Sequence, residues 1–438
     1  YNWGYDPQHF HALEGSYSSN PYDGNVRIKE FKQLVLSLHS EGIGVILDVV
    51  YNHTFFAKES IFNQTVPGYF YRQKPDGSFS NASGCGNEIA SERKMVREYI
   101  IDSLKYWVEE FHVDGFRFDL MGIYDLETMK TIRSEMDKLD DGLFLYGEGW
   151  IADQSPMNEQ LRAIKKNIAQ LPGIGCFNDD FRDALKGNHG SKKNKGFISG
   201  LDLREEAVKF GVVGAVDHPQ IVYNFVETSE RAWATEPDQC INYVSCHDNY
   251  TLWDKLKLSA TKATGIELQK MVKLAGALIL TSQGVPFLHS GIEFCRTKAG
   301  SGNSYNLPDS VNQIDWDRKD KYLDVFEYYK KLIQLRKNHP AFRMTTSEQI
   351  RNNLKFCTPY QLGIVSYCIQ GKEVGDSWEI IILIFNGNKG KIVIPIPEGI
   401  YRIVAEGNEI NEFETDKTVS DEVQVEGISM TILVKTEE

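Results

Sequence analysis

Residues 43–53 read IGVILDVVYNH, an apolar and largely β-branched run that ends in Tyr, Asn and His. The run predicts a strand buried on both faces, as in a parallel sheet covered by helices. The preceding residues 25–42 carry apolar side chains at helical spacing, and Gly42 ends that pattern. A helix followed by a buried strand with polar residues at its carboxyl end indicates an α/β fold.

The same alternation continues to about residue 340. Five further strands are predicted, at 113–120, 143–149, 173–179, 241–248 and 284–290. Helices are predicted at 89–111, 125–139, 157–170, 266–281 and 322–339. Strands that alternate with helices indicate a parallel sheet. Polar, glycine-containing segments near 54–88 and 187–235 are interpreted as loop insertions in this domain, which we expect to span 1–340.

The pattern changes after His339-Pro340. Short strand-like segments follow, separated by Gly, Asn and Pro, at 362–369, 379–385, 390–395, 400–405 and 428–434. No long helical pattern interrupts them. We therefore expect residues 341–438 to form a C-terminal antiparallel β-sandwich domain.

Composition excludes several classes of partner. The chain of 438 residues carries 61 Asp and Glu against 48 Lys and Arg, a formal net charge of −13, with no basic cluster. This balance argues against nucleic acid and anionic membranes as partners. Seven cysteines without paired motif spacing do not predict a disulfide framework and favour a reducing compartment. Secretion stays open, although neither a signal peptide nor an apolar run of membrane-spanning length can be read.

Chemically competent side chains collect where the predicted strands end. These residues are Asn52, His53, Arg117, Asp119, Glu148, Trp150, His247 and Asp248. In α/β barrels the carboxyl ends of the strands carry the functional residues. We therefore expect these side chains to face one site.

Each of these residues also has a structural interpretation when it is taken alone. Arg117 and Asp119 share one face of a strand, where the arginine favours an ionised carboxylate, but such a pair can be purely structural. Glu148 lies between Gly147 and Gly149, which would leave room for a substrate, but it can equally be a helix N-terminal carboxylate. Asp248 can be a turn former and His53 a satisfied buried histidine.

The joint pattern favours catalysis. Glycoside hydrolysis needs two carboxyl groups, one that attacks or activates water and one that protonates the leaving oxygen. A third can stabilise the cationic transition state. Metal ligation is the rival use of Asp and His, but no compact ligand motif can be read, so no metal site is predicted.

Four segments, DVVYNH, GFRFDL, YGEGW and YVSCHDN, resemble the four signature regions of the α-amylase superfamily of glycoside hydrolases. They occur in the family's order. YNWGYDP at 1–7, EGSYSSNP at 14–21 and NSYNLPDSVNQIDW at 303–316 resemble type I pullulanases, the starch-debranching members of that superfamily. The resemblance covers nearly the whole chain and is thinnest after about residue 340.

The resemblance implies a retaining enzyme with a (β/α)8 TIM barrel followed by a β-sandwich, acting on α-1,6 branch linkages of pullulan, amylopectin and related α-glucans. Asp119 matches the nucleophile, Glu148 the general acid/base and Asp248 the transition-state stabiliser. The substrate-binding positions that it implies are Tyr5, His53, Arg117, Trp150, His247 and Asp309. Asp48 matches an aspartate with a more structural role. No cofactor is implied; calcium is common in the superfamily, but no ligand loop for it can be read here.

The sequence also departs from the family pattern. Ser245-Cys246 and Ile292 stand where other residues are usual, which bears on fine specificity. In the family two barrel strands precede the YNWGYDP segment, so we expect this chain to be part of a longer protein. Two enzyme alternatives stay open, an isoamylase or glycogen-debranching hydrolase and an α-amylase-type hydrolase. A noncatalytic α-glucan-binding protein is the alternative from another class.

Overall fold

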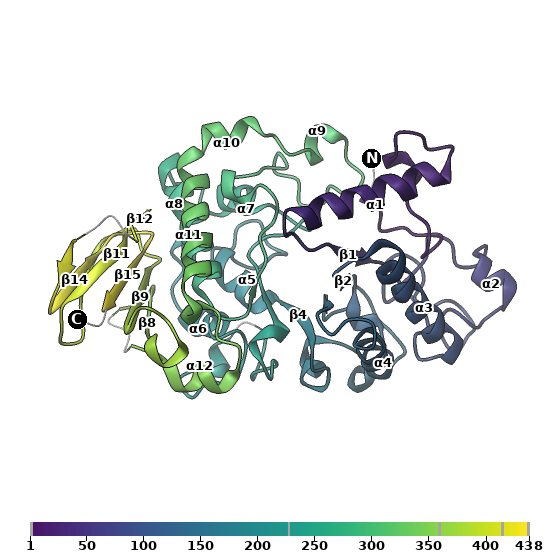
Figure 1. The fold of residues 1–438 in the computed structure, drawn as a ribbon, viewed down its shortest axis with the longest axis horizontal. Coiled ribbons are helices and arrows are strands. Elements are labelled where there is room, and N and C mark those ends of the chain that lie inside the picture. The colour runs from purple at the N-terminus through teal and green to yellow at the C-terminus, as the bar shows by residue number, and fades with distance from the viewer. Residues whose placement is uncertain (1–2, 227, 358–360, 413–415, 436–438) are drawn as a thin grey trace. The chain divides into compact units, whose positions relative to one another are not determined.

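The structure, a computed structural model, describes residues 3–226, 228–357, 361–412 and 416–435 (Figure 1). Tyr1 and Asn2 of the YNWGYDP segment lie outside the described residues. The chain divides into two compact units, here called the amino-terminal unit (Gly4–Phe177) and the carboxy-terminal unit (Asn178–Glu438 with Trp3). No helix among the described residues combines the length and apolar character needed to span a membrane.

A parallel sheet of six strands follows the order of the chain, β1-β2-β3-β4-β5-β6. Its strands are β1 (Ile46–Val49), β2 (Gly115–Phe118), β3 (Phe144–Gly147), β4 (Ile174–Asn178), β5 (Cys240–Asn242) and β6 (Val285–Pro286). The predicted α/β alternation is therefore confirmed. The predicted 241–248 strand is shorter than expected, because strand geometry ends at Asn242.

Four helices belong to the amino-terminal unit: α1 (Gly24–Ser40), α2 (Ile61–Thr65), α3 (Lys94–Phe111) and α4 (Leu126–Met136). Asp125 caps α4 by accepting a hydrogen bond from the amide of Thr128 at 2.9 Å. The prediction that both faces of the 43–53 strand are buried is wrong. Ile46 and Asp48 are exposed, because β1 ends the sheet and has β2 as its partner in the described chain.

The carboxy-terminal unit holds β5, β6 and eight helices of the described chain. The helices are α5 (Asp179–Lys186), α6 (Glu205–Val212), α7 (Leu252–Ser259), α8 (Gly265–Thr281), α9 (Asp309–Asn312), α10 (Asp317–Lys321), α11 (Leu323–Asn338) and α12 (Ser347–Asn353). α8 begins with a capping box in which Thr264 and Glu267 bond each other's backbone amides. α6 lies inside the segment 187–235 that was expected to be a loop, and its apolar side chains are buried.

Antiparallel strands complete this unit and confirm the expected C-terminal β domain. They are β7 (Leu354–Phe356), β8 (Ile364–Gln370), β9 (Ile380–Asn386), β10 (Ile392–Pro395), β11 (Tyr401–Glu406), β12 (Glu409–Ile410), β13 (Thr418–Val419), β14 (Glu422–Val425) and β15 (Ser429–Lys435). One sheet has the order β12-β11-β15-β9-β8-β7, with β13 on β11, and β10 pairs with β14. Both sheets contribute to one apolar core, for example Ile384 and Leu433 from the larger and Val425 from the smaller.

Candidate active site

The register of β1, β2 and β3 brings three strand ends of the amino-terminal unit together. Asp48 is paired with Arg117, and Arg117 with Tyr146, across the parallel sheet. The alignment continues past the strands, since the amide of Asp119 donates to Val49 O and the amide of Glu148 donates to Phe118 O, each at 3.1 Å. Because the three strands run parallel and in equal register, the residues that follow them lie together at the carboxyl ends of the strands.

Arg117 lies at the centre of the residues that gather at these strand ends. Its Nη1 lies 2.7 Å from Asp48 Oδ1 and 2.8 Å from Asp119 Oδ1, and its Nη2 lies 2.7 Å from Glu148 Oε1. Burial alone would lower the pKa of Arg117, but the Glu148 and Asp48 carboxylates raise it well above its ordinary value. The expectation that Arg117 and Asp119 lie together is thus confirmed. One guanidinium therefore faces three carboxyl groups.

Glu148 is buried, with 5% of the residue exposed. Its second carboxylate oxygen accepts a hydrogen bond from the amide of Leu120 at 2.9 Å. Both flanking glycines are required by close packing against the protein itself. A Cβ on Gly147 would lie 2.6 Å from Phe118 O, and one on Gly149 would lie 2.4 Å from Cys176 Sγ.

Tyr5 covers the charged cluster from the segment before α1. Its hydroxyl donates to Asp48 Oδ2 at 2.5 Å, and the Arg117 guanidinium lies 5.6 Å from its ring centroid. Burial raises the pKa of Tyr5, so its hydroxyl is a neutral donor. The ring is therefore held in place by both a hydrogen bond and a cation–π contact.

Asn52 joins His53 to Asp119; the sequence placed it among the strand-end residues but assigned it no role. Its Nδ2 donates to both the main-chain oxygen and Oδ2 of Asp119 at 2.8 Å, and its Oδ1 lies 2.6 Å from His53 Nδ1. Burial lowers the pKa of His53, which is 2% exposed.

Trp150 lies two residues beyond Glu148, at the same strand end. Its ring centroid is 6.4 Å from that of Phe177, at an interplanar angle of 40°. Its amide donates to Glu148 O at 2.8 Å. The main chain around the carboxylate is therefore fixed on both sides.

His247, Asp248 and Asp309 belong to the carboxy-terminal unit. His247 Nε2 lies 3.8 Å from Asp248 Oδ1, and its ring meets Trp3 edge to face with centroids 4.8 Å apart. Lys298 Nζ donates to the main-chain oxygen of His247 at 2.6 Å. Asp309 is exposed at the first turn of α9, and Trp3 Nε1 donates to Asn312 Oδ1 of the same helix at 3.2 Å.

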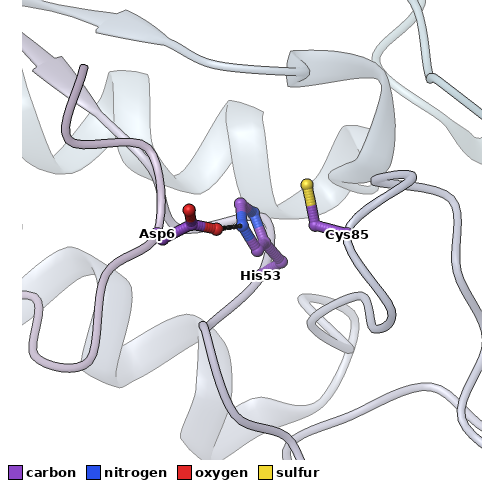
Figure 2. A group of neighbouring side chains, drawn as sticks. All are labelled: Asp6, His53 and Cys85. Carbon is purple, nitrogen blue, oxygen red and sulfur yellow. Dashed lines mark ion pairs between the residues drawn. The ribbon is translucent and has the colours of Figure 1, made fainter. Parts of the chain in front are cut away.

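One group of side chains among the described residues has the composition of a metal site. Asp6, His53 and Cys85 each offer a ligand atom, and these atoms lie within 4.8 Å of one another (Figure 2). No compact motif spacing predicts such a set, because its members come from three separate segments.

Comparison with known proteins agrees with the fold and the motifs. Residues 350–409 match the pullulanase all-beta domain. The chain is 42% identical over 434 residues to the pullulanase of Bacillus subtilis, covering 99% of this chain and 59% of that relative. It therefore spans less than two thirds of the length of this relative.

Solved structures give the same result. The pullulanase type I of Bacillus subtilis in complex with maltose superposes with a TM-score of 0.94 at 41% identity, covering 100% of this chain and 60% of that chain. The pullulanase of Paenibacillus barengoltzii in complex with maltohexaose and α-cyclodextrin gives a TM-score of 0.91 at 42% identity, covering 100% and 66%. By its sequence and its fold over nearly all of its length, this chain belongs to the pullulanase family.

Proposed function

We propose that this protein is a retaining glycoside hydrolase that cleaves α-1,6 branch linkages in pullulan, amylopectin and related α-glucans. The observation that carries the proposal is the pair Asp119 and Glu148 held on one Arg117 guanidinium. Pullulanases of the same family bind maltose and maltohexaose, which supports an α-glucan as the substrate class.

The mechanism follows from two carboxyl groups in different roles. Asp119 attacks the anomeric carbon and forms a covalent glycosyl-enzyme, while Glu148 protonates the leaving oxygen. Glu148 then takes a proton from a water molecule as the water oxygen attacks the anomeric carbon. This attack breaks the bond between the sugar and Asp119 and releases the product. Retaining enzymes need these groups about 5–5.5 Å apart. Binding both carboxylates to one guanidinium supports a short separation.

Arg117 holds Asp119 as an anion, because a nearby positive charge favours the charged form of a carboxyl group. Asp248 stabilises the oxocarbenium-like charge of the transition state. A neutral Tyr5 ring stacks on the sugar being cleaved, and His53 and His247 hydrogen-bond its hydroxyl groups. Trp150 contacts the leaving chain, and Asp309 contacts sugars further from the scissile bond.

We further propose that the parallel sheet belongs to a (β/α)8 barrel domain, residues 1–340 of this chain, with the insertions near 54–88 and 187–235. Residues 341–438 are its C-terminal β-sandwich. The six parallel strands and the shared apolar core of the two antiparallel sheets support this architecture.

The substrate assignment is tested by incubating the full-length protein with pullulan, amylose and glycogen in parallel. We expect maltotriose from pullulan. Hydrolysis of amylose without maltotriose release would indicate an α-amylase-type enzyme, and faster hydrolysis of glycogen would indicate an isoamylase-type enzyme. Binding of dextrins without turnover of any polymer would indicate a noncatalytic protein.

Asp119→Ala tests the nucleophile. The fold should survive, since Arg117 keeps its ion pairs with Asp48 and Glu148. We expect kcat to fall by at least on the order of 10⁴-fold with dextrin binding retained. Asp102→Ala, an exposed change on α3, is the matched control. Turnover by Asp119→Ala at the wild-type rate would exclude this nucleophile.

A further inference from the structure

Three side chains with metal-ligating atoms meet at the amino-terminal unit's strand-end cluster. Asp6 lies in the segment before α1, His53 follows β1, and Cys85 lies in the loop between α2 and α3. Figure 2 shows the His53 ring between the Asp6 carboxylate and the Cys85 thiol. The three ligand atoms lie within 4.8 Å of one another.

The His53 ring is oriented as a ligand. Its Nδ1 faces Asn52 Oδ1 at 2.6 Å, and an amide oxygen can only accept a hydrogen bond, so Nδ1 carries the proton. Asn52 is fixed in turn by its two hydrogen bonds to Asp119. Metal-binding histidines are commonly oriented through the other ring nitrogen in this way.

This tautomer leaves a lone pair on His53 Nε2. That atom is buried and has no hydrogen-bond partner among the described residues. It lies 3.6 Å from Asp6 Oδ1, so two acceptors face each other. A cation between the two atoms satisfies both.

Cys85 is presented by a loop with a defined conformation. Gly84 and Gly86 adopt left-handed backbone geometry with φ of 73° and 95°, and the Cys85 amide donates to Ser83 Oγ at 3.0 Å. A divalent ion bound at this loop would stabilise the thiolate form of the Cys85 side chain.

We propose that Asp6, His53 and Cys85 form a three-ligand site for Zn²⁺, and that Zn²⁺ bound there inhibits the enzyme by taking the His53 nitrogen offered to the sugar. A set of nitrogen, sulfur and oxygen ligands suits Zn²⁺. It does not suit Ca²⁺ or Mg²⁺, which prefer oxygen ligands alone. The inhibition half of this proposal rests on the proposed function, whereas the metal-binding half does not.

The geometry allows the ligands to close on an ion. Zinc–ligand bonds of about 2.0–2.3 Å require the most distant ligand atoms to approach by about 1 Å. The Asp6 side chain is 34% exposed and Cys85 is exposed, so both can rotate while the buried His53 stays fixed.

Binding is tested on the full-length protein with Co²⁺ as a spectroscopic substitute for Zn²⁺. We expect a sulfur-to-cobalt charge-transfer band that Zn²⁺ abolishes by displacement. Cys85→Ser should lose the band and bind Zn²⁺ at least about tenfold more weakly in equilibrium dialysis. Cys357→Ser, at a half-buried thiol far from these ligands in the chain, is the control and should keep the band. A wild-type protein without the band, or a band that survives Cys85→Ser, would overturn the site.

Inhibition is tested by titrating Zn²⁺ into the pullulan assay. Without metal, Cys85→Ser should match the wild type, since the thiol is not part of the proposed catalytic set. With metal it should be at least about tenfold less sensitive, and a chelator should restore the wild type. Equal sensitivity of the two proteins would overturn the inhibition. If pullulan is not cleaved at all, displacement of the cobalt band by maltotriose still tests competition, and its absence would overturn the overlap with a sugar site.

Discussion

At the scale of single residues, the site is organised by one guanidinium that is shared among three carboxyl groups. Arg117 is 6% exposed, yet it contacts Asp48, Asp119 and Glu148 at 2.7–2.8 Å. A buried guanidinium is tolerated only when such partners satisfy it. Removing one carboxylate still leaves two, so substitutions at Asp119 or Glu148 test chemistry rather than folding.

Glu148→Gln should separate proton transfer from structure. The amide oxygen can still accept from either the Leu120 amide or Arg117 Nη2, the amide nitrogen then faces the other donor, and the side chain no longer transfers a proton. We expect kcat on pullulan to fall by about 10²–10⁴-fold, the usual contribution of a general acid. Glu109→Gln, an exposed change on α3, is the control. A kcat within about twofold of the wild type would remove Glu148 from the mechanism.

At the scale of elements, the turn after β3 is set by close packing at two glycines. A Cβ at Gly149 would lie 2.4 Å from Cys176 Sγ and 2.6 Å from the amide of Lys165. That amide donates to Gly149 O at 2.8 Å, so the two segments cannot separate without losing a hydrogen bond. The position of Glu148 therefore depends on its neighbour having no side chain.

Gly149→Ala should lower stability and activity together. Overpacking of this kind costs about 1–3 kcal/mol, measured as a shift in the urea unfolding midpoint. The displaced turn should also reduce kcat. Gly265→Ala is the control, because a Cβ there meets nothing within 4 Å. If Gly149→Ala unfolded at the same urea concentration as the wild type, β4 would have moved away from the added Cβ without loss of stability. The close packing would then not determine the turn.

The sequence predicts those elements whose apolar spacing matches their burial. Residues 25–42, 266–281 and 322–339 are largely helical as expected, because their packing follows a helical stripe. The predicted helix at 157–170 is wrong, since this stretch holds two 3₁₀ turns, Glu159–Leu161 and Lys165–Gln170. Its amides bond other segments instead: Ala163 donates to Tyr124 O and Lys165 to Gly149 O. Such tertiary hydrogen bonds cannot be read from periodicity.

The candidate site, like the helices and strands, was predictable only in part. The alternation of side chains along a strand predicts that Arg117 lies beside Asp119. The parallel order of the strands predicts that Glu148 lies at the same carboxyl ends. The role of Asn52 and the approach of Cys85 to His53 were not predictable. They depend on loop conformations that bring together positions 6, 53 and 85, which are distant in the chain.

At the scale of the whole molecule, a buried histidine connects α11 to the β domain within the carboxy-terminal unit. His339 follows α11, is 3% exposed, and stacks on Trp378 with ring centroids 3.4 Å apart. Its Nδ1 lies 2.7 Å from Asp376 Oδ1, and its Nε2 lies 3.2 Å from Glu412 Oε1. One imidazole therefore contacts two carboxylates, that of Asp376 before β9 and that of Glu412 after β12.

His339→Phe should loosen this connection in a pH-dependent manner. Burial alone would raise the pKa of Asp376, but its hydrogen bonds to His339 and to the amides of Trp378 and Ala341 hold it below its ordinary value of 3.8. A folded-state pKa below the unfolded one means that this stabilisation is fully present above 3.8 and is lost as the pH falls through the folded value. Phenylalanine keeps the ring on Trp378 but removes both polar contacts. We expect a loss of about 3 kcal/mol near neutral pH, read as faster amide hydrogen exchange in β9 and β11.

The difference between wild type and His339→Phe should shrink as the pH is lowered from neutral to below 3.8, because protonation of Asp376 removes the stabilisation that its ionised form gains from His339. The exposed His9→Phe is the control and should leave the exchange of β9 and β11 unchanged at both pH values. A loss that is equally large at both pH values would mean that His339 acts through packing on Trp378 alone. In that case the carboxylates Asp376 and Glu412 would contribute nothing to the attachment of the β domain to α11.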